Sequence, residues 1–287
     1  MDGYETFRFR TRDGLTLAGR SYGSRSLPGL PVVCLAGLTR NAADFDALAR
    51  YLCHERRVVS LDMRGRGASE RDPNPDNYDL VVEATDAIDG IAAAGIEDCA
   101  IVGTSRGAIL AIVISAIRPA IMRAVVMNDL GPVIEPEGLR AIRDYLSRSP
   151  AVANWDEAAA SAKVAHGASF PKVDDAGWER FARAVFTERS GSIVPAHDPA
   201  IHRTLDAVAA GAMPPPMWTA FAGLRRLPVL SIRGQLSTLF CAETQEEMAR
   251  RHPALRTHVV PDQGHAPLLD DEPTMSAISQ FLASVDH

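Results

Sequence analysis

Strand-like and helix-like segments alternate along most of this 287-residue sequence, and that alternation constrains the fold more than any other feature. Short apolar runs typical of fully buried strands occur at 30–37, 56–63, 99–103, 121–129, 227–232 and 255–261. Helical patterns follow most of them, near 44–53, 78–93, 106–117, 242–251 and from 272 onward. Strands that alternate with helices predict an α/β fold, with a mostly parallel sheet covered by helices on both faces.

Two local patterns predict how individual segments pack. The stretch "FRFRTRDGLTLAG" alternates in polarity, turns at Asp13-Gly14 and alternates again, which is typical of a β-hairpin. In the helix near 78–93, helical spacing predicts that one face points to the core, and this face carries Val81, Thr85, Ile88 and Ile91.

The alternation stops between about Gly131 and Gly223, where the sequence predicts several helices, one of them over 177–186, and no strand. All three tryptophans lie in this stretch: Trp155, Trp178 and Trp218. We therefore predict an α/β core formed by 1–131 and 223–287, with 132–222 inserted as a helical lid. Such a lid would cover the C-terminal edge of the sheet, where open α/β sheets bind their ligands.

Composition excludes several classes of protein. The formal net charge of −6 gives no electrostatic reason to expect nucleic acid or an anionic membrane surface as a partner. The longest apolar run, 100–117, contains Arg106 and two glycines, which argues against a membrane span. The four cysteines are widely spaced and "MDGYETFRFR" has no apolar signal segment, so we expect a cytoplasmic protein with reduced thiols.

The segment "IVGTSRGAIL" carries the clearest chemical motif. Its Gly103-Thr104-Ser105-Arg106-Gly107 matches G-x-S-x-G, with a buried strand before it and a helix after it. Small neighbours permit the tight strand-to-helix turn on which a nucleophilic serine sits. At the N-terminus of a helix, exposed N–H groups and the helix dipole favour developing negative charge. Ser105 is therefore the predicted nucleophile.

His265, in "PDQGHAP", follows the last predicted strand, on a loop that can bring an imidazole over the crevice. An imidazole takes and returns a proton near neutral pH, which suits a general base. The other histidines are scattered, and His197 and His202 are five residues apart rather than the four of a helical zinc pair. We therefore expect no metal. "RGRGAS" lacks the third glycine of a dinucleotide fingerprint, so we expect no cofactor either.

These motifs together resemble those of the α/β-hydrolase family, in particular its lidded esterase and lactonase members. The resemblance covers nearly the whole chain, through "GTSRG", "LDMRGRGAS", "VVMNDLGP" and "VVPDQGHAPLLDDEP". It implies an eight-stranded sheet with one antiparallel strand and the lid inserted after strand six. It also implies that His265 is the catalytic histidine, and that the backbone N–H groups of Leu38 and Arg106 form the oxyanion hole. Relatives often have His-Gly where this chain has Ala36-Gly37.

The acid of the triad is less clear from the sequence. Family members most often place an Asp after strand seven, but "RGQLSTLF" (233–240) contains no acid, and Thr238 stands at that position. Asp129, at the end of strand six, is the strongest substitute, because some family members take their acid from there and the order Ser, Asp, His fits. The same Asp could instead only stabilise a turn into the lid. Other candidates are Glu243, Asp262 or no carboxylate at all.

The resulting functional hypothesis is a serine hydrolase for a small, partly apolar ester or lactone. Ser105 would attack the carbonyl, His265 would take its proton and Asp129 would orient the histidine. The aromatic residues Trp178, Trp218 and Phe221 are predicted to contact the substrate. The alternatives are a C–C bond hydrolase of a diketone, a ligand-binding protein without activity, and a cofactor-free lyase or oxygenase with a His–Asp base.

Overall fold

The computed structural model describes residues 3–147 and 152–286. Eight of the strands in this described part form one sheet in the order β1-β2-β4-β3-β5-β6-β9-β10. Strand β2 runs antiparallel to both of its neighbours, β1 and β4, and all other pairs are parallel. The predicted α/β class is confirmed. The strands are β1 (Glu5–Arg10), β2 (Thr16–Tyr22), β3 (Gly29–Leu35), β4 (Arg56–Asp62), β5 (Cys99–Thr104), β6 (Met122–Asn128), β9 (Val229–Gly234) and β10 (Leu255–Val260).

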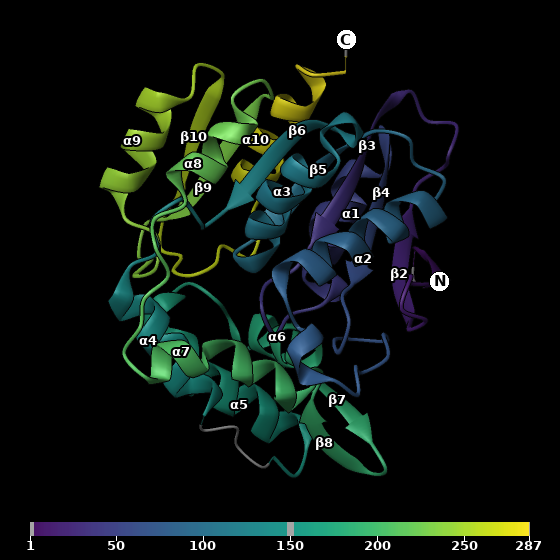
Figure 1. Ribbon diagram of the computed structural model, residues 1–287. Helices are drawn as coiled ribbons and strands as arrows, with labels where there is room; N and C mark the ends of the chain where they lie inside the picture. The colour runs from purple at the N-terminus through teal and green to yellow at the C-terminus, as the bar shows by residue number, and fades with distance from the viewer. Residues whose placement is uncertain (1–2, 148–151, 287) are drawn as a thin grey trace.

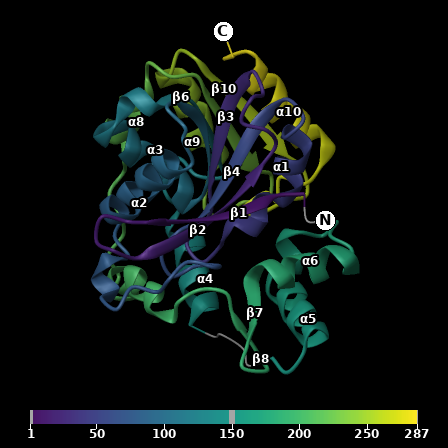
Figure 2. The same cartoon turned by 90° about the vertical axis from the view of Figure 1, so that its right-hand side faces the viewer.

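Helices cover both faces of the sheet (Figures 1 and 2). Residues of α2, α3 and α9 share one apolar cluster with one face, and residues of α1 and α10 share another cluster with the opposite face. These helices are α1 (Asp46–Leu52), α2 (Leu80–Ala93), α3 (Arg106–Ile117), α9 (Ala242–Arg251) and α10 (Glu272–Ala283). The 3-10 turns are η1 (Ala42–Phe45), η2 (Pro75–Asn77), η3 (Pro119–Ile121), η4 (Gly167–Ser169), η5 (Pro199–Leu205) and η6 (Ala222–Leu224).

The insert between β6 and β9 lies below the C-terminal ends of the parallel strands in Figure 1. It contains α4 (Pro136–Leu146), α5 (Trp155–His166), α6 (Asp175–Val185), β7 (Phe186–Arg189), β8 (Ser192–Pro195), α7 (Asp206–Ala209) and α8 (Trp218–Phe221). The prediction that it has no strand was wrong, because β7 and β8 pair as an antiparallel hairpin. Each strand has only four residues, too few for an alternating pattern to stand out. Phe186, predicted on the helix over 177–186, begins β7.

The end of the insert belongs to the core by its packing. Helix α8, inside the range 132–222 predicted as the lid, packs against α3. Phe221 is buried in the larger of the two core clusters. The chain therefore returns to the core several residues before Gly223.

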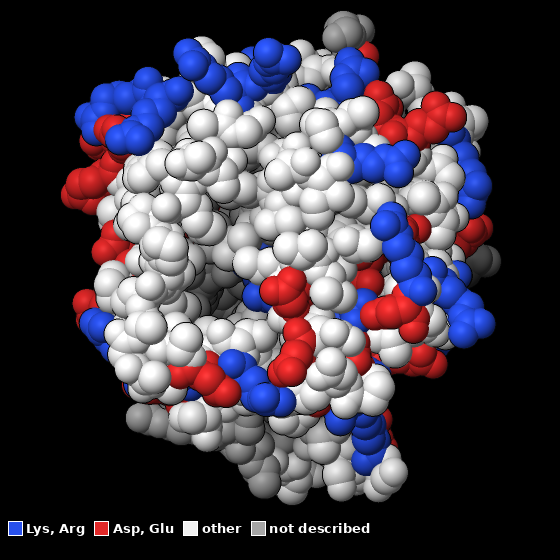
Figure 3. Space-filling view, in the orientation of Figure 1, with Lys and Arg blue, Asp and Glu red and all other residues white. Residues whose placement is uncertain are grey.

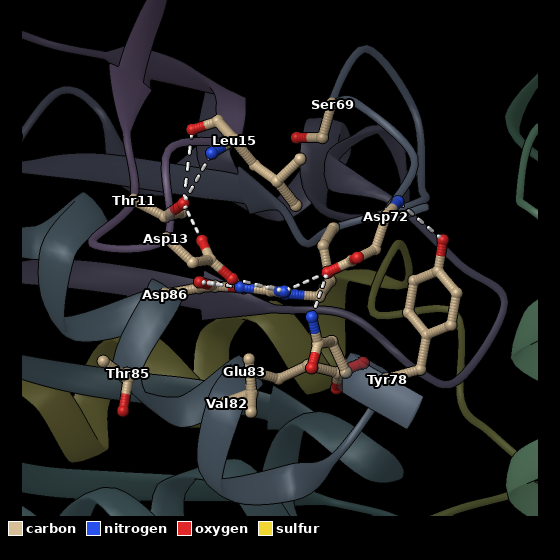
Figure 4. A network of polar contacts seen from close by, with 12 residues as sticks. Thr11, Asp13, Leu15, Ser69, Asp72, Tyr78, Val82, Glu83, Thr85 and Asp86 are labelled. Atoms are coloured by element: carbon tan, nitrogen blue, oxygen red, sulfur yellow. Dashed lines mark hydrogen bonds and ion pairs between the residues drawn. The ribbon is translucent and has the colours of Figure 1, made fainter. Parts of the chain in front are cut away.

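Helix α2 faces the core differently from the predicted pattern. Val81, expected inside, is 56% exposed, whereas Glu83 and Asp86 are buried. Their carboxylates pair with the buried arginines Arg66 and Arg64 (Figure 4 shows the polar contacts around Asp86). Ile88 and Ile91 are buried as predicted and Thr85 is half-buried, so the prediction was wrong for Val81. Buried ion pairs, and not apolar side chains alone, fix the orientation of this helix.

Candidate active site

Ser105 lies on a sharp turn between β5 and α3. Its backbone has φ 52° and ψ −115°, a strained conformation for a residue with a side chain. The turn depends on the two motif glycines, since a Cβ on Gly107 would lie 2.0 Å from the carbonyl oxygen of Leu35. A Cβ on Gly103 would lie 2.4 Å from the carbonyl carbon of Gly107. Helix α3 thus lies too close to β5 for a side chain at Gly103, and too close to β3 for a side chain at Gly107.

The loop after β10 brings His265 to this serine. Its Nε2 lies 2.9 Å from Ser105 Oγ, and its Nδ1 lies 2.8 Å from Asp129 Oδ2. When Nδ1–H donates to the carboxylate, Nε2 is left as the acceptor for the serine hydroxyl. The three side chains predicted as the triad therefore form one continuous hydrogen-bonded chain.

Asp129 comes directly after β6 and is completely buried, at 0% exposure. Its Oδ1 accepts the Gly234 N–H at 2.7 Å, and its own N–H donates to the Ile232 carbonyl at 2.8 Å. Among the residues that the structure describes, Asp129 is the only carboxylate within ion-pair distance of His265. Of the other candidates, Glu243 lies in the first turn of α9, and Asp262 lies in the turn after β10.

The segment "RGQLSTLF" after β9 supports the acid instead of supplying one. Thr238, which stands at the family's usual acid position, is exposed. Its neighbour Ser237 donates its hydroxyl to Asp129 Oδ2 at 2.6 Å. The same hydroxyl oxygen accepts the N–H groups of Leu239 and Phe240, the next residues of the turn. Sequence reasoning missed Ser237, although a serine that opens a turn at this strand end was the available signal.

We expect Ser237→Ala to lower kcat/KM about 10-fold, because Asp129 then loses one charge-assisted hydrogen bond. Thr238→Ala is the matched control, since this exposed neighbour makes no such contact, and its kcat/KM should stay within about twofold of the wild type. Steady-state kinetics on one chromogenic ester measures both. Equal losses in the two variants would contradict a specific role for Ser237.

Asn128 is a second residue that the sequence reasoning did not assign. Its buried side-chain amide donates to the Pro267 carbonyl at 2.9 Å and to Thr104 Oγ1 at 3.1 Å. It therefore ties the loop that carries His265 to the strand that precedes Ser105.

The two residues predicted for the oxyanion hole lie on either side of Ser105. Arg106 is the first residue of α3, where an N–H has no acceptor within the helix. Leu38 follows Gly37, and a Cβ on Gly37 would lie 3.8 Å from Ser105 Cβ. Within 3–147 and 152–286, neither N–H group donates to a protein acceptor. Both donors are thus available to a ligand next to the serine.

A buried ionic network of Arg66 and Glu83 connects Leu38 with Arg106. Arg66 donates from Nε to the Leu38 carbonyl at 2.5 Å, and its Nη1 lies 2.9 Å from Glu83 Oε1. Glu83 Oε2 accepts from Arg106 Nε at 2.7 Å. Burial by itself would raise the pKa of Glu83, but the charges of Arg66 and Arg106 outweigh it and lower that pKa below its ordinary value. Glu83 is therefore a carboxylate held between two cations.

The insert between β6 and β9 contacts the segment that carries Arg66. The Gly67 N–H donates to the Ala196 carbonyl at 2.9 Å, and the Asp198 N–H donates to the Gly65 carbonyl at 2.7 Å. The glycines on both sides of Arg66 are thus hydrogen-bonded to the chain that follows β8.

The three aromatics predicted to contact the substrate are packed against other side chains. Trp178 is buried inside the insert, in a cluster with Phe170 that also packs against Leu268 of the loop that carries His265. Phe221 is 2% exposed and packs edge-on against Trp218, whose ring is covered by the Arg251 guanidinium at 4.1 Å. Trp178 and Phe221 are therefore packing residues, and Trp218 is half-buried against the core.

The face of the molecule in Figure 3 is hollowed between the helices of the insert and the core, and mostly uncharged residues surround the hollow. His197 and His202 lie in the insert with their Nε2 atoms 2.9 Å apart. Burial lowers the pKa of His197 to about 4. No group of three or more potential metal ligands is found in the described ranges. None of the helices described is long and apolar enough to cross a membrane.

Comparison with known proteins gives one family. The model of the "alpha/beta hydrolase family" matches residues 32–277. The chain is 30% identical to a 3-hydroxybutyrate-oligomer hydrolase of Cupriavidus necator, over 92% of each protein. It is 28% identical to a 2-(acetamidomethylene)succinate hydrolase of Mesorhizobium japonicum, over 93% of this chain and 92% of that protein. A crystal structure of an alpha/beta hydrolase from Novosphingobium aromaticivorans superposes with a TM-score of 0.91 at 37% identity, over 99% of this chain and 100% of that one.

Proposed function

The chain belongs to the α/β-hydrolase family, and we propose that it is a serine hydrolase that cleaves a small, partly apolar carboxylic ester or lactone through an acyl-enzyme. The observation that carries this proposal is the chain of hydrogen bonds from Ser105 Oγ through His265 to Asp129. A serine bonded to an imidazole that is itself held by a buried carboxylate is the arrangement that activates a hydroxyl as a nucleophile.

In the proposed reaction, each residue of the candidate site has a defined role. His265 Nε2 takes the hydroxyl proton as Ser105 Oγ bonds to the substrate carbonyl carbon, and Asp129 stabilises the imidazolium. The N–H groups of Leu38 and Arg106 donate to the oxyanion of the tetrahedral intermediate. His265 then gives its proton to the leaving alcohol oxygen. Water repeats the sequence on the acyl-enzyme, releases the acid and restores Ser105.

Two observations support an ester among the possible substrates. The hydrolase from Cupriavidus necator is named for 3-hydroxybutyrate oligomers, and hydroxy acids joined through hydroxyl and carboxyl are esters. The mostly uncharged surround of the hollow in Figure 3 suits a partly apolar substrate. The hypothesis of an inactive ligand-binding protein arose from the missing acid after β9, and the contact of Asp129 with His265 removes that reason.

The test is covalent labelling with a fluorophosphonate probe, together with turnover of 4-nitrophenyl acetate. We expect the wild type to be labelled on the peptide that contains Ser105, and Ser105→Ala to be neither labelled nor active, because the nucleophile is gone. Mass spectrometry locates the adduct. A folded wild-type protein that neither reacts with the probe nor hydrolyses the ester would contradict the proposed function.

A further inference from the structure

A charged side chain stands beside the candidate nucleophile without a role in the steps above. Arg40 lies on the loop that carries Gly37 and Leu38. The position that a Cβ on Gly37 would take is 3.4 Å from Arg40 Cγ and 3.8 Å from Ser105 Cβ. The stem of Arg40 therefore lies on the same side of the loop as the serine.

The guanidinium of Arg40 is held on one edge and open on the other. Its Nε and Nη2 donate to the two carboxylate oxygens of Asp44 at 2.8 and 2.7 Å, and its plane stacks on Phe181 at 4.3 Å from the ring centroid. In the part of the chain described, Nη1 donates to no protein acceptor. Asp44 and Phe181 thus fix the orientation of a fork whose remaining N–H groups are available to a ligand.

Two neutral polar rings from the lid lie next to this fork. His166 of α5 packs 5.3 Å from Phe181 and 4.7 Å from Tyr145 of α4, between ring centroids. Burial, with a further contribution from the charge of Arg40, lowers the pKa of His166 to about 4, so the ring is neutral near pH 7. Neither ring has a hydrogen-bond partner for its polar atoms within the described residues. Both are only half-buried.

These groups adjoin the oxyanion loop on its lid side. Tyr145 packs in the same apolar cluster as Leu38, and it lines a small cavity together with Thr39. One oriented cation, Arg40, and two neutral hydrogen-bonding groups, Tyr145 and His166, therefore lie around the loop. The cation is already paired with the carboxylate of Asp44.

We infer that Arg40, with Tyr145 and His166, forms a subsite for a carboxylate on the substrate. This inference rests on the proposed function for the position of the reacting ester, and it narrows the substrates to esters that also carry a free acid a few atoms from the scissile carbonyl. A guanidinium binds a carboxylate in the plane of its fork, and a stacked, pre-oriented guanidinium loses little conformational entropy on binding.

A matched pair of substrates tests the subsite. 4-Nitrophenyl butyrate and the 4-nitrophenyl half-ester of succinic acid differ at the acyl terminus, which is a methyl group in one and a carboxylate in the other. We expect the wild type to prefer the half-ester by at least about 10-fold in kcat/KM after subtraction of the uncatalysed rate, since a hydrogen bond to a charged group contributes this much. In Arg40→Met the ratio should fall toward one.

Arg183→Met is the control, because Arg183 also stacks on a lid ring, that of Trp155 at 4.6 Å, but lies exposed on the outside of α6. It should keep the wild-type ratio. A wild type without preference for the half-ester, or an Arg40→Met variant with an unchanged ratio, would overturn the subsite.

Binding without turnover separates this inference from the proposed function. Isothermal titration of Ser105→Ala with monomethyl succinate and with methyl butyrate should give a Kd at least about 10-fold lower for the half-ester, and Arg40→Met in the same background should remove the difference. If neither nitrophenyl ester is hydrolysed but this difference in Kd is found, the proposed function fails and the subsite stands. Equal Kd values for the two ligands would overturn the subsite.

Discussion

Replacement of Asp129 by Asn is expected to lower kcat by about 10⁴-fold with little change in KM. The buried carboxylate accepts a hydrogen bond from His265 Nδ1–H, and in the proposed mechanism its charge stabilises the imidazolium that forms when Ser105 reacts. An amide has no charge, and its NH₂ group would favour the tautomer in which Nδ1 is the acceptor. Nε2 would then carry a proton and could not take the one on Ser105. Steady-state kinetics against pH, with circular dichroism to check the fold, measures the effect.

The other acids named from the sequence supply the controls. Glu243→Gln and Asp262→Asn should keep kcat within about threefold of the wild type, because the side chain paired with His265 is that of Asp129. An essentially active Asp129→Asn variant would rule out Asp129 as the acid of the triad. A large loss of kcat in Glu243→Gln or Asp262→Asn would then identify that residue as the acid.

The candidate nucleophile Ser105 and its partner His265 could be predicted from the sequence because their signals are local. G-x-S-x-G between a buried strand and a helix predicts one backbone geometry, and His265 follows a recognisable last strand. The role of Asp129 could not be decided from the sequence, because an Asn-Asp turn has the same local sequence whether or not its carboxylate reaches the histidine. The position of the carboxylate depends on the pairing of β6 with β9. This pairing aligns Asn128 with Ile232 and so places Asp129 beside Gly234 and Ser237.

The error on helix α2 has a physical cause. Val81 was placed inside because periodicity counts apolar side chains, whereas the inward face of α2 is set by Glu83 and Asp86 and their arginine partners. A buried charge is costly unless a partner meets it, and its partner comes from a distant segment that the local pattern does not contain. The buried ion pairs behind the candidate active site are therefore difficult to predict from local sequence patterns.

The second prediction with a large expected effect concerns Arg66, which belongs to the same buried ion pairs. Its guanidinium reaches the Leu38 carbonyl, the Arg64 carbonyl and Glu83 at once. A lysine could keep the ion pair with Glu83, but a single ammonium cannot also hold the Leu38 carbonyl in the plane of a fork. The Leu38 N–H would then lose its fixed direction toward the oxyanion. Arg66 is thus a positioning residue, and we expect Arg66→Lys to lower kcat about 100-fold while KM changes little.

Arg64→Lys is a stringent control for this prediction. Arg64 and Arg66 are equally buried, at 1% exposure each, and Arg64 is also ion-paired, with Asp72 and Asp86 (Figure 4), but it does not touch the oxyanion loop. Both variants should lose thermal stability, because each leaves buried acceptors poorly matched. Only Arg66→Lys should also lose kcat and bind a boronic acid transition-state analogue more weakly, in parallel with that loss. If the two variants lose activity equally, Arg66 contributes to the fold alone and the oxyanion hole is held by other contacts.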